Sequence, residues 1–341
     1  MVAAADFVYV RGMADENATS HVRWTQVQRI AAVGEPLLEL QPGEGGRIHV
    51  AFGGDVANGL VCLSRLLGAQ RFEFSVLTAL GNSSYSAWLR ERLTREGILV
   101  REPPNGLIGE PGIYGIPLDP VHRTAFSYWR NHSAARAFLQ SATLPDFEQL
   151  LGRPNLLFVT GVTLALCSAT SFESLCRWVQ THRHQCDVVF DSNFRRALWS
   201  AETLARERIG LFETLASVIA TGMEDEKGLW SCADPADISE RLGKLSVELL
   251  IRNGQQGCYV GTPRQYTHVA ASKATAVDTA GAGDAHLAGY VAARISGCAQ
   301  SDAALFANRV AAMIVGQLGS AAAPGLEFPP FPAGCAKNHD H

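Results

Sequence analysis

The sequence has no large excess of charge and no long apolar run. Its 29 Lys and Arg residues stand against 33 Asp and Glu, a formal net charge of -4, and no dense basic run occurs. This excludes the basic face typical of nucleic-acid-binding proteins. No window approaches the ~18 apolar residues of a membrane-spanning helix, so no membrane partner is expected. The first residues also lack the regions of a secretory signal, and we predict a cytoplasmic protein.

Two kinds of short motif are also missing. No C-x-x-C pair occurs, which argues against a cysteine metal site and predicts buried free thiols in a reducing compartment. The eight cysteines are Cys62, Cys167, Cys176, Cys186, Cys232, Cys258, Cys298 and Cys335. No G-x-x-x-x-G-K-[ST] and no G-x-G-x-x-G stretch occurs either, so a P-loop and a dinucleotide-binding fingerprint are both absent.

What is present suits one large α/β domain. Apolar residues make up 47% of the chain and charged residues 18%, enough for a sizeable core. Short apolar segments alternate with amphipathic ones. The expected strands cover 30–34, 74–81, 156–161, 187–191, 217–221 and 247–251. The expected helices cover 56–68, 84–96, 170–184, 202–213, 235–245, 285–296 and 301–317. This alternation predicts a mostly parallel sheet with helices on both faces and ligands at the carboxyl ends of the strands.

Two segments break this pattern. Residues 46–54 and 109–130 alternate in twos and contain turn residues, so we expect a small antiparallel sheet inserted into the body as a lid. Exposed strand edges need cover, which favours a homo-oligomer, a lid-mediated dimer. The domain itself is predicted to span 29–330, after a mobile extension at 1–28 and before a tail at 331–341.

The stretch DTAGAGD at 278–284 carries the strongest chemical signal. Gly281 and Gly283 let the backbone approach a ligand closely, and a helix pattern begins at once. A glycine-rich loop at a helix N-terminus is a cradle for a phosphoryl group. Asp284 would repel that group, but it suits a base that takes the proton of an attacking hydroxyl. The alternative is that Asp284 is a helix cap.

The stretch FGGDVAN at 52–58 joins an expected strand to an expected helix. Its two glycines allow close backbone approach, and Asp55 and Asn58 could grip sugar hydroxyl groups. An ordinary capped helix would give the same pattern, so this stretch leaves both interpretations open.

Two further stretches place cations beside polar groups. In SYWRNHSAA at 127–135, Tyr128 and Arg130 share one face of a strand. In DSNFRRALW at 191–199, Arg195 follows a strand end and could bind a carboxylate or a phosphate through two parallel hydrogen bonds. A surface salt bridge is the commoner fate of a single arginine.

Together these motifs resemble the PfkB/ribokinase-like carbohydrate kinases, whose signature is D-T-x-G-A-G-D. From about residue 30 to residue 325 the sequence is similar to the 2-keto-3-deoxygluconate kinases of that family. The matching stretches are GEPLLEL (34–40), FGGDVAN (52–58), VTALG (77–81), PGIY (111–114), YWRNHSAA (128–135), TGVTLAL (160–166), DSNFRRALW (191–199) and DTAGAGD (278–284). The resemblance implies a ribokinase-like three-layer α/β/α fold. It also implies transfer of the ATP γ-phosphoryl group to the 6-hydroxyl of 2-keto-3-deoxygluconate.

The resemblance assigns roles on the sugar side of the site. Asp284 would be the catalytic base. The implied anion hole is Gly281, Ala282 and Gly283. The implied sugar contacts are Gly54, Asp55, Asn58, Tyr114, Tyr128 and Arg130. Arg195 would complete the grip on the substrate carboxylate.

It also assigns roles on the nucleotide side. The implied contacts are Asn193 near the phosphates, Asn253, Gly254 and Gly257 along the nucleotide, and Asn308 against adenine. Glu224 falls where the family often has the glutamate of an N-x-x-E metal motif. ATP and Mg²⁺ are the implied cofactors, and a monovalent cation is a further candidate.

Three residues depart from the family pattern. Thr221 stands where the metal motif has Asn, which weakens the case for Glu224 as a ligand. Arg252 takes the place of the usual Lys before the nucleotide loop. His286 occupies a position where an aromatic residue is common, and we interpret it as a packed helix histidine.

Two other functions fit the same residues. A PfkB kinase for another sugar, such as fructose or a nucleoside, would give Arg130 and Arg195 no acid to pair with. A non-catalytic sugar-binding protein on the same fold would have no need of Asp284 and its glycine-rich loop. The sequence therefore favours the sugar-acid kinase.

Overall fold

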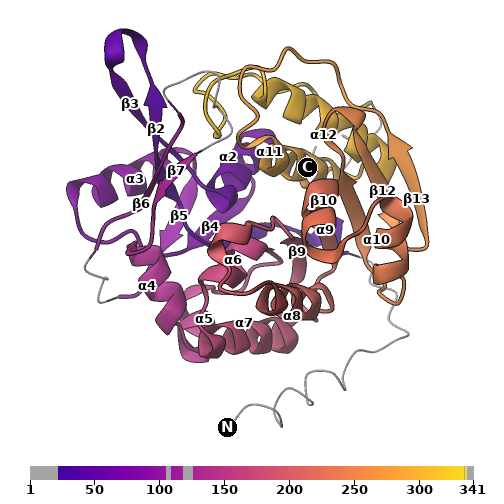
Figure 1. Ribbon diagram of the computed structural model, residues 1–341, viewed down its shortest axis with the longest axis horizontal. Helices are drawn as coiled ribbons and strands as arrows, with labels where there is room; N and C mark the ends of the chain where they lie inside the picture. Colours follow the sequence, from indigo (N-terminus) through magenta and orange to yellow (C-terminus); the bar gives the residue numbers. More distant parts are fainter. Residues whose placement is uncertain (1–21, 105–108, 118–125, 334, 336–341) are drawn as a thin grey trace.

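The main feature of the computed structural model, which describes residues 22–104, 109–117, 126–333 and 335, is a nine-stranded sheet (Figure 1). Its strand order is β13-β12-β11-β10-β9-β8-β1-β4-β5. The strands are β1 (Arg29–Val33), β4 (Glu73–Leu77), β5 (Ile98–Arg101), β8 (Leu156–Thr160), β9 (Asp187–Asp191), β10 (Val218–Gly222), β11 (Glu248–Arg252), β12 (Cys258–Thr262) and β13 (Gln265–Val269). From β11 to β5 all neighbours are parallel, and β12 and β13 add an antiparallel edge. The mostly parallel sheet is confirmed.

Helices cover both faces of this sheet (Figure 1). One face carries α2 (Asp55–Leu67), α3 (Ser84–Arg95), α11 (Ala282–Ile295) and α12 (Gln300–Ile314). The other carries α4 (Ala134–Ser141), α5 (Leu144–Leu150), α6 (Gly161–Leu166), α7 (Ala169–His182), α8 (Glu202–Glu213), α9 (Met223–Trp230) and α10 (Pro235–Leu242). Side chains alternate along each strand, so Ile30 and Ala32 enter one core while Ala31 and Val33 enter the other. Short 3-10 helices occur at η1 (Trp24–Gln26), η2 (Glu44–Gly46), η4 (Arg196–Leu198) and η5 (Gly254–Gln256).

A second, four-stranded sheet forms the lid, in the order β3-β2-β6-β7. Its strands are β2 (Leu37–Pro42), β3 (Ile48–Gly53), β6 (Gly112–Gly115) and β7 (Ser127–Trp129). The β2–β3 hairpin projects from the body at the upper left of Figure 1. The expectation of a wholly antiparallel lid is wrong, because β2 and β6 pair in parallel. The turn expected at Asp119-Pro120 lies outside the described residues.

The ends of the domain differ from the predicted boundaries. Residues 22–28 are not a free extension, because Trp24 is buried in the core and its Nε1 donates to Glu248 at 3.3 Å. The ion pair between Arg23 and Asp187, 3.1 Å long, anchors the same segment. The part of the expected extension at 1–21 lies outside the described residues. Within the described ranges, no helix combines the length and apolar character that crossing a membrane requires.

Two of the eight cysteines, all of which were expected to be free thiols, are bonded to each other. Cys298 and Cys335 form a disulfide, because the chain after α12 returns to the end of α11. The other six cysteines are free and buried, as expected. The predicted tail at 331–341 is therefore attached to the body at least up to residue 335.

Candidate active site

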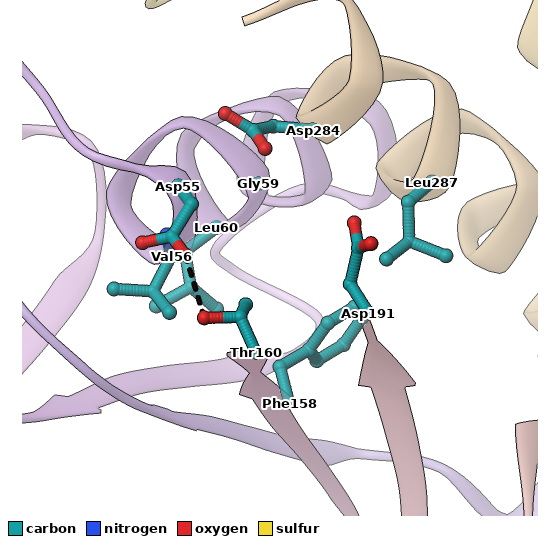
Figure 2. Close-up of a pocket in the computed structure, with 9 residues that line it drawn as sticks. All are labelled: Asp55, Val56, Gly59, Leu60, Phe158, Thr160, Asp191, Asp284 and Leu287. Atoms are coloured by element: carbon teal, nitrogen blue, oxygen red, sulfur yellow. Dashed lines mark hydrogen bonds between the residues drawn. The ribbon is translucent and has the colours of Figure 1, made fainter. Parts of the chain in front are cut away.

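The carboxyl ends of β8 and β9 meet the N-terminal ends of α2 and α11 around a small cavity (Figure 2). Its lining consists of Asp55, Val56, Gly59, Leu60, Phe158, Thr160, Asp191, Asp284 and Leu287. Carboxylates from three elements thus surround one space, Asp55 from α2, Asp191 from β9 and Asp284 from α11. This is the edge of a parallel sheet where ligands bind, because loops and helix N-termini converge there.

Asp284 lies in the first turn of α11 and is partly exposed. Its Oδ2 accepts a hydrogen bond from Nδ2 of Asn58 at 2.8 Å. Burial raises the pKa of Asp284 to about 7, with the charges of Asp55 and Asp191 adding to the rise and Asn58 and Arg252 opposing it. A carboxylate with this pKa can take and release a proton near neutral pH. The helix-cap alternative is not supported, because Gly281 is the N-cap residue and Asp284 bonds no backbone N–H of the described chain.

The loop before α11 presents backbone donors beside this carboxylate. Gly281 adopts φ of +71°, and a Cβ atom there would lie 1.9 Å from the carbonyl oxygen of Ser320. The N–H groups of Gly283 and Asp284 donate to no acceptor among the described residues, as expected for the first turn of a helix. Asp278 fixes the loop by accepting from the N–H groups of Ala280 and Gly319. Free N–H groups at a helix N-terminus can bind an anion.

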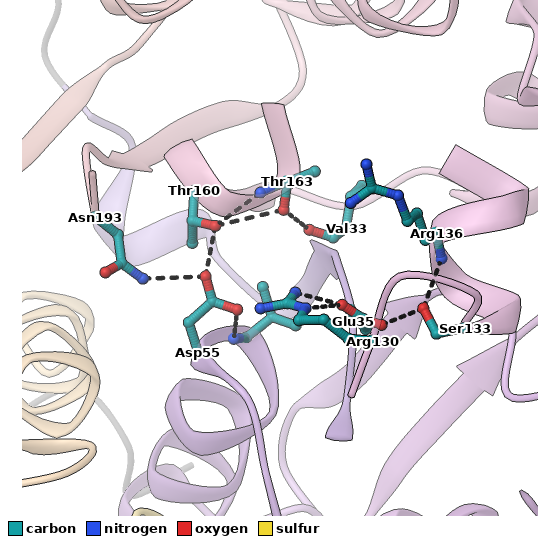
Figure 3. A network of polar contacts seen from close by, with 10 residues as sticks. Val33, Glu35, Asp55, Arg130, Ser133, Arg136, Thr160, Thr163 and Asn193 are labelled. Atoms are coloured by element: carbon teal, nitrogen blue, oxygen red, sulfur yellow. Dashed lines mark hydrogen bonds and ion pairs between the residues drawn. The ribbon is translucent and has the colours of Figure 1, made fainter. Parts of the chain in front are cut away.

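Asp55 begins α2 and is held by three donors (Figure 3). Its Oδ2 accepts from the hydroxyl of Thr160 at 2.6 Å and from Nδ2 of Asn193 at 3.1 Å, and its Oδ1 accepts from the N–H of Val56. Asn193 adopts a φ of +29°, a strained value for a residue other than glycine. Such strain is maintained where it orients functional groups. The structure therefore brings the predicted Asp55 and Asn193 into direct contact.

Position 54, where a sugar contact is predicted, also requires glycine for the fold itself. Gly54 precedes α2 with φ of +101°, and a Cβ atom there would lie 2.5 Å from the carbonyl oxygen of Glu35. A side chain at this position would push the lid connection away from α2.

A chain of hydrogen bonds runs from the lid to Asp284. Tyr114 on β6 bonds Glu39 on β2 and lies 2.6 Å from the hydroxyl of Ser320. The Ser320 hydroxyl in turn lies 3.2 Å from Oδ1 of Asn58, whose amide nitrogen donates to Asp284. Burial raises the pKa of Glu39, although donors from Gln41 and Ser320 oppose the rise. Tyr114 is thus buried and bonded within the protein, with its hydroxyl beside the residues that orient Asn58.

Tyr128 lies opposite Tyr114 in the β6–β7 pair and stacks on it, with ring centroids 6.0 Å apart. About half of Tyr128 is exposed. Of the two predicted lid tyrosines, Tyr128 is the one with free surface for a ligand.

Arg130 does not offer a free charge. Its Nε and Nη2 bond Oε2 of Glu35, whose other oxygen accepts from Ser133 (Figure 3). Arg130 and Glu35 are both buried. Burial raises the pKa of Glu35, and Arg130 and Ser133 oppose the rise. The sugar contact of Arg130 stays a prediction, and in this structure its charge is already paired inside the protein.

Arg195 stands apart from the cavity. Its side chain is 57% exposed and lies 3.8 Å from Asp225, a long ion pair across the start of α9. It is absent from the cavity lining given above. The structure shows the salt bridge that was the alternative for this residue, and its exposed guanidinium still has room for a ligand.

The nucleotide-side residues fall into two groups. Asn253 and Gly254 lie in the partly exposed η5 turn, and Gly257 closes that turn with φ of +96°. Asn308 is different, because it is buried, donates to the carbonyl oxygens of Val269 and Ala270, and pairs with His286 at 3.0 Å. The adenine contact of Asn308 stays a prediction, and in this structure protein groups bond both ends of its amide.

His286 is the packed helix histidine that the sequence suggested. It is buried, and burial lowers its pKa to about 4, with Arg252 adding to the effect, so the ring is neutral near pH 7. It serves to fix Asn308 between α11 and α12.

The predicted metal residue Glu224 is exposed and makes no hydrogen bond or ion pair with another described residue. Its neighbour Asp225 is the acid that faces Arg195, and Glu226 is buried against Arg241. Thr221, which replaces the Asn of the metal motif, donates to Glu226. In the described ranges no three His, Cys, Asp or Glu side chains are arranged to hold a metal ion. Mg²⁺ in phosphotransferases is held by one or two carboxylates together with substrate phosphates, so a complete protein cage is not required.

Several residues that shape this site had no structural role assigned from the sequence. Arg252 bonds both oxygens of Asp191, and its Nη1 donates to the carbonyl oxygen of Gly283 at 3.0 Å. Thr160 and Ser320 bond Asp55 and Asn58, respectively. Thr160 could have been found as the polar last residue of an apolar strand. Nothing in the sequence marks Ser320, because its contact depends on how the loop after α12 returns to α2.

The chain is similar to a family of known proteins over most of its length. The family described as "pfkB family carbohydrate kinase" matches residues 25–326. The 2-dehydro-3-deoxygluconokinase of Dickeya dadantii is 28% identical over 84% of this chain and 94% of its own length. A fructokinase of Klebsiella pneumoniae is 27% identical over 89% of this chain and 96% of its own.

Solved structures show the same fold. The 2-dehydro-3-deoxygluconokinase of Thermotoga maritima covers 87% of this chain and 95% of its own, with 19% identity and a TM-score of 0.73. A fructokinase of Vibrio cholerae, solved with fructose, ADP and potassium ion, covers 86% and 94% with 21% identity and a TM-score of 0.73. The expected ribokinase-like α/β architecture is therefore confirmed.

Proposed function

The chain belongs to the pfkB family of carbohydrate kinases, and we propose that it transfers the γ-phosphoryl group of ATP to the 6-hydroxyl of 2-keto-3-deoxygluconate. In this reaction the bond between the sugar oxygen and the γ-phosphorus forms, the bond from that phosphorus to ADP breaks, and the hydroxyl proton passes to a base. The products are 2-keto-3-deoxy-6-phosphogluconate and ADP.

The observation that carries the proposal is the position of Asp284 beside the free N–H groups of α11. The carboxylate borders the cavity and has a pKa of about 7, so it suits the base that takes the hydroxyl proton. The N–H groups of Gly283 and Asp284 would bind the phosphoryl oxygens, where negative charge is greatest during transfer. Gly281 allows that turn through its positive φ. Asp55 and Asn58 are proposed to bind the sugar hydroxyls.

A divalent cation brought in with the nucleotide fits the residues present. When bound, it would offset phosphate charge and polarise the transferred group. Glu224 is exposed at the start of α9 and is proposed to bind it through water. We propose that ATP lies along the η5 turn, where Asn253 and Gly254 have exposed surface, with a monovalent cation as an additional candidate.

The sugar-acid assignment rests on the relatives named 2-dehydro-3-deoxygluconokinase and on the matching motifs. Arg195 is proposed to reach the substrate carboxylate from its exposed position, and Tyr128 to pack on the sugar. A specific observation favours a second candidate, a kinase of a neutral ketose. The charge of Arg130 is neutralised by Glu35, and a fructokinase is 27% identical to this chain.

A coupled assay of ATP consumption over a panel of sugar acids and neutral sugars tests the proposal. We expect 2-keto-3-deoxygluconate to give the highest kcat/KM, and the variant D284N to bind both substrates but lose roughly two to four orders of magnitude in kcat. Highest activity on fructose would replace the first candidate by the second. No turnover on any sugar, by folded protein, would overturn both.

The variants Arg195→Ala and Arg195→Lys separate the two candidates at the level of one residue. A charge-assisted bond to a carboxylate is worth about 1.5–3 kcal/mol, roughly ten- to a hundredfold in kcat/KM. We expect both variants to lose that much on the sugar acid and much less on a neutral ketose, because Lys lacks the planar fork. An equal loss on both substrates would assign Arg195 to the nucleotide phosphates.

A further inference from the structure

Arg252 makes a set of contacts that the proposed reaction does not use. It is the last residue of β11, and its guanidinium crosses the end of β10 to bond both oxygens of Asp191 on β9. The same Nη1 that contacts Asp191 at 2.8 Å also donates to the carbonyl oxygen of Gly283 at 3.0 Å. One side chain thus connects two strands of the sheet to the first turn of α11.

This arrangement places a cation where a helix normally disfavours it. The N-terminal end of a helix carries a partial positive charge, so a guanidinium there is unfavourable unless an anion balances it. Asp191 supplies that anion in a geometry with two parallel bonds, and the side chains of Arg252 and Asp191 are 15% and 4% exposed. The cation is therefore balanced where it lies, and its bond to the carbonyl oxygen of Gly283 ties the ion pair to the first turn of α11.

The bonds of Asp191 continue around the cavity. Its Oδ1 accepts from the N–H of Asn193 at 3.2 Å, and Nδ2 of Asn193 donates to Asp55. The contacts therefore run from Gly283 through Arg252, Asp191 and Asn193 to Asp55 without interruption. The two sides of the cavity, α11 and α2, are held in one hydrogen-bonded frame.

We infer that Arg252 is a positioning residue, which by bridging Asp191 and Gly283 holds the first turn of α11 so that Asp284 and its neighbouring N–H groups face the reacting hydroxyl and phosphoryl groups. The inference rests on the proposed kinase activity. Arg252 touches neither substrate in this role, so its effect is on the chemical step and not on binding.

The charge of Arg252 also acts on Asp284. The groups that face Asp284 are Asp55 from α2, Asp191 from β9 and Arg252 from β11, with Asn58 adding a neutral hydrogen bond. Arg252 lowers the pKa of Asp284, against burial and the two carboxylates, which raise it. Loss of the guanidinium leaves Asp191 without its partner and Asp284 with carboxylate neighbours, so Asp284 should lose its proton at higher pH.

The test is the pH profile of kcat for Arg252→Met and Arg252→Lys. The Met variant should lose about 10- to 100-fold in kcat at pH 7, while the KM values for ATP and for the sugar stay within about threefold of wild type. The acid limb of its kcat profile should shift to higher pH by about one unit. The Lys variant keeps the charge without the fork, so its acid limb should stay near that of wild type while kcat falls by less than in the Met variant.

Arg294→Met is the matched control. Arg294 lies at the other end of α11 and pairs with the buried Glu248 at 2.9 Å, so its loss removes a comparable ion pair far from Asp284. We expect this variant to lower the Tm without moving the pH profile. A shift of the acid limb in the control, or none in Arg252→Met, overturns the positioning role.

The remaining outcomes separate the two proposals. A raised KM for ATP with unchanged kcat in Arg252→Met would mean that Arg252 binds phosphate, which overturns the positioning role but keeps the kinase. An inactive wild-type protein overturns the proposed function itself. If Arg252→Met fails to fold, the profile of Arg252→Lys decides, because a fall in kcat with unchanged KM and acid limb supports positioning and an unchanged kcat contradicts it.

Discussion

Asp284 must be ionised to act as a base, and its surroundings make ionisation costly. Burial together with Asp55 and Asp191 raises its pKa from 3.8 to about 7. In the unfolded chain the same carboxyl ionises near its ordinary value, so the folded protein binds one more proton than the unfolded chain between about pH 4 and pH 7. The contribution of Asp284 to the free energy of unfolding therefore falls as the pH rises through that window. The proposed catalytic base therefore works against folding at the pH where it would act.

The variant D284N should therefore be more stable than wild type at pH 8, because Asn carries no charge and can still accept from Asn58. One pKa unit corresponds to about 1.4 kcal/mol, and allowing for the partial exposure of the side chain we expect a gain on the order of 1–3 kcal/mol. The measurement is the difference in Tm between D284N and wild type from pH 4 to pH 8. The difference should grow up to about pH 7 and then stay constant, and a constant difference over the whole range would contradict the linkage.

Among elements, the start of α11 is tightly constrained. Gly281 has φ of +71°, and the carbonyl of Ser320 occupies the space where a Cβ atom would lie. The loop after α12 and the N-terminus of α11 are therefore packed backbone against backbone. Any side chain at 281 must displace one of them, and with it the free N–H groups at the cavity.

Gly281→Ala should lower stability by at least about 2 kcal/mol and reduce kcat more than tenfold, because it combines an unfavourable φ with a collision. Gly45→Ala is the control, since Gly45 also has positive φ, +66°, but no atom lies within 4 Å of its Cβ position. The Tm and kcat of both variants are to be compared. If the two variants behave alike, the Ser320 contact does not constrain the loop.

The elements also show what the sequence could predict. Segments such as Asp187–Asp191 were predicted correctly because strands buried on both faces are continuously apolar. The central lid strand Leu37–Pro42 was missed, since it carries a buried Glu39 that only the Tyr114 and Ser320 contacts explain. The short strands Cys258–Thr262 and Gln265–Val269 are partly exposed and gave no apolar run.

The candidate site was predictable in part for a similar reason. Asp55 and Asp284 could be named because each opens a helix after a glycine turn, a local pattern. The partners of Arg130 and Arg252 could not be named from the sequence, because the order of the strands in space decides which side chains these two arginines meet. The sequence gives no register between β2, β6 and β7, or across β9, β10 and β11.

The lid strands should respond to the sugar. Tyr114 and Tyr128 lie on one lid face with Glu39, and Tyr114 is connected through Ser320 to Asn58. A sugar bound between lid and body should slow amide hydrogen exchange in β6 and β7, because closure excludes water. The measurement compares D284N with and without saturating sugar acid. Helix α7 is the internal control, and unchanged exchange in β6 and β7 would contradict a closing lid.

At the scale of the whole molecule, the lid has two faces of different character. Side chains alternate across its strands, so Glu39, Tyr114 and Tyr128 share one face. The opposite face carries Ile48, Val50 and Trp129, which are 54%, 43% and 59% exposed. Exposed apolar side chains gathered on a sheet favour association with a partner.

We therefore predict that the protein is a dimer formed through the lids. Light scattering at micromolar concentration should give twice the 36.7 kDa of one chain. The double variant Ile48→Lys, Val50→Lys should give the monomer, because like charges would face each other across a two-fold axis. The control is Tyr85→Lys, which changes a side chain that is 56% exposed on α3 of the body. A monomeric wild type would refute the dimer.

The parallel pairing of β2 with β6 has a consequence for the order of folding. Leu37 lies opposite Gly112, so the two central lid strands are far apart in the sequence. The strands β4 and β5, which lie between them in the chain, belong to the body sheet. A pairing of such distant segments closes a long loop, and it forms after the contacts that bring its ends together. The β2–β6 pairing should therefore form after the local contacts of β4, α3 and β5, which lie between its two strands in the chain. A newly made chain would therefore assemble this part of the body before it completes the lid sheet.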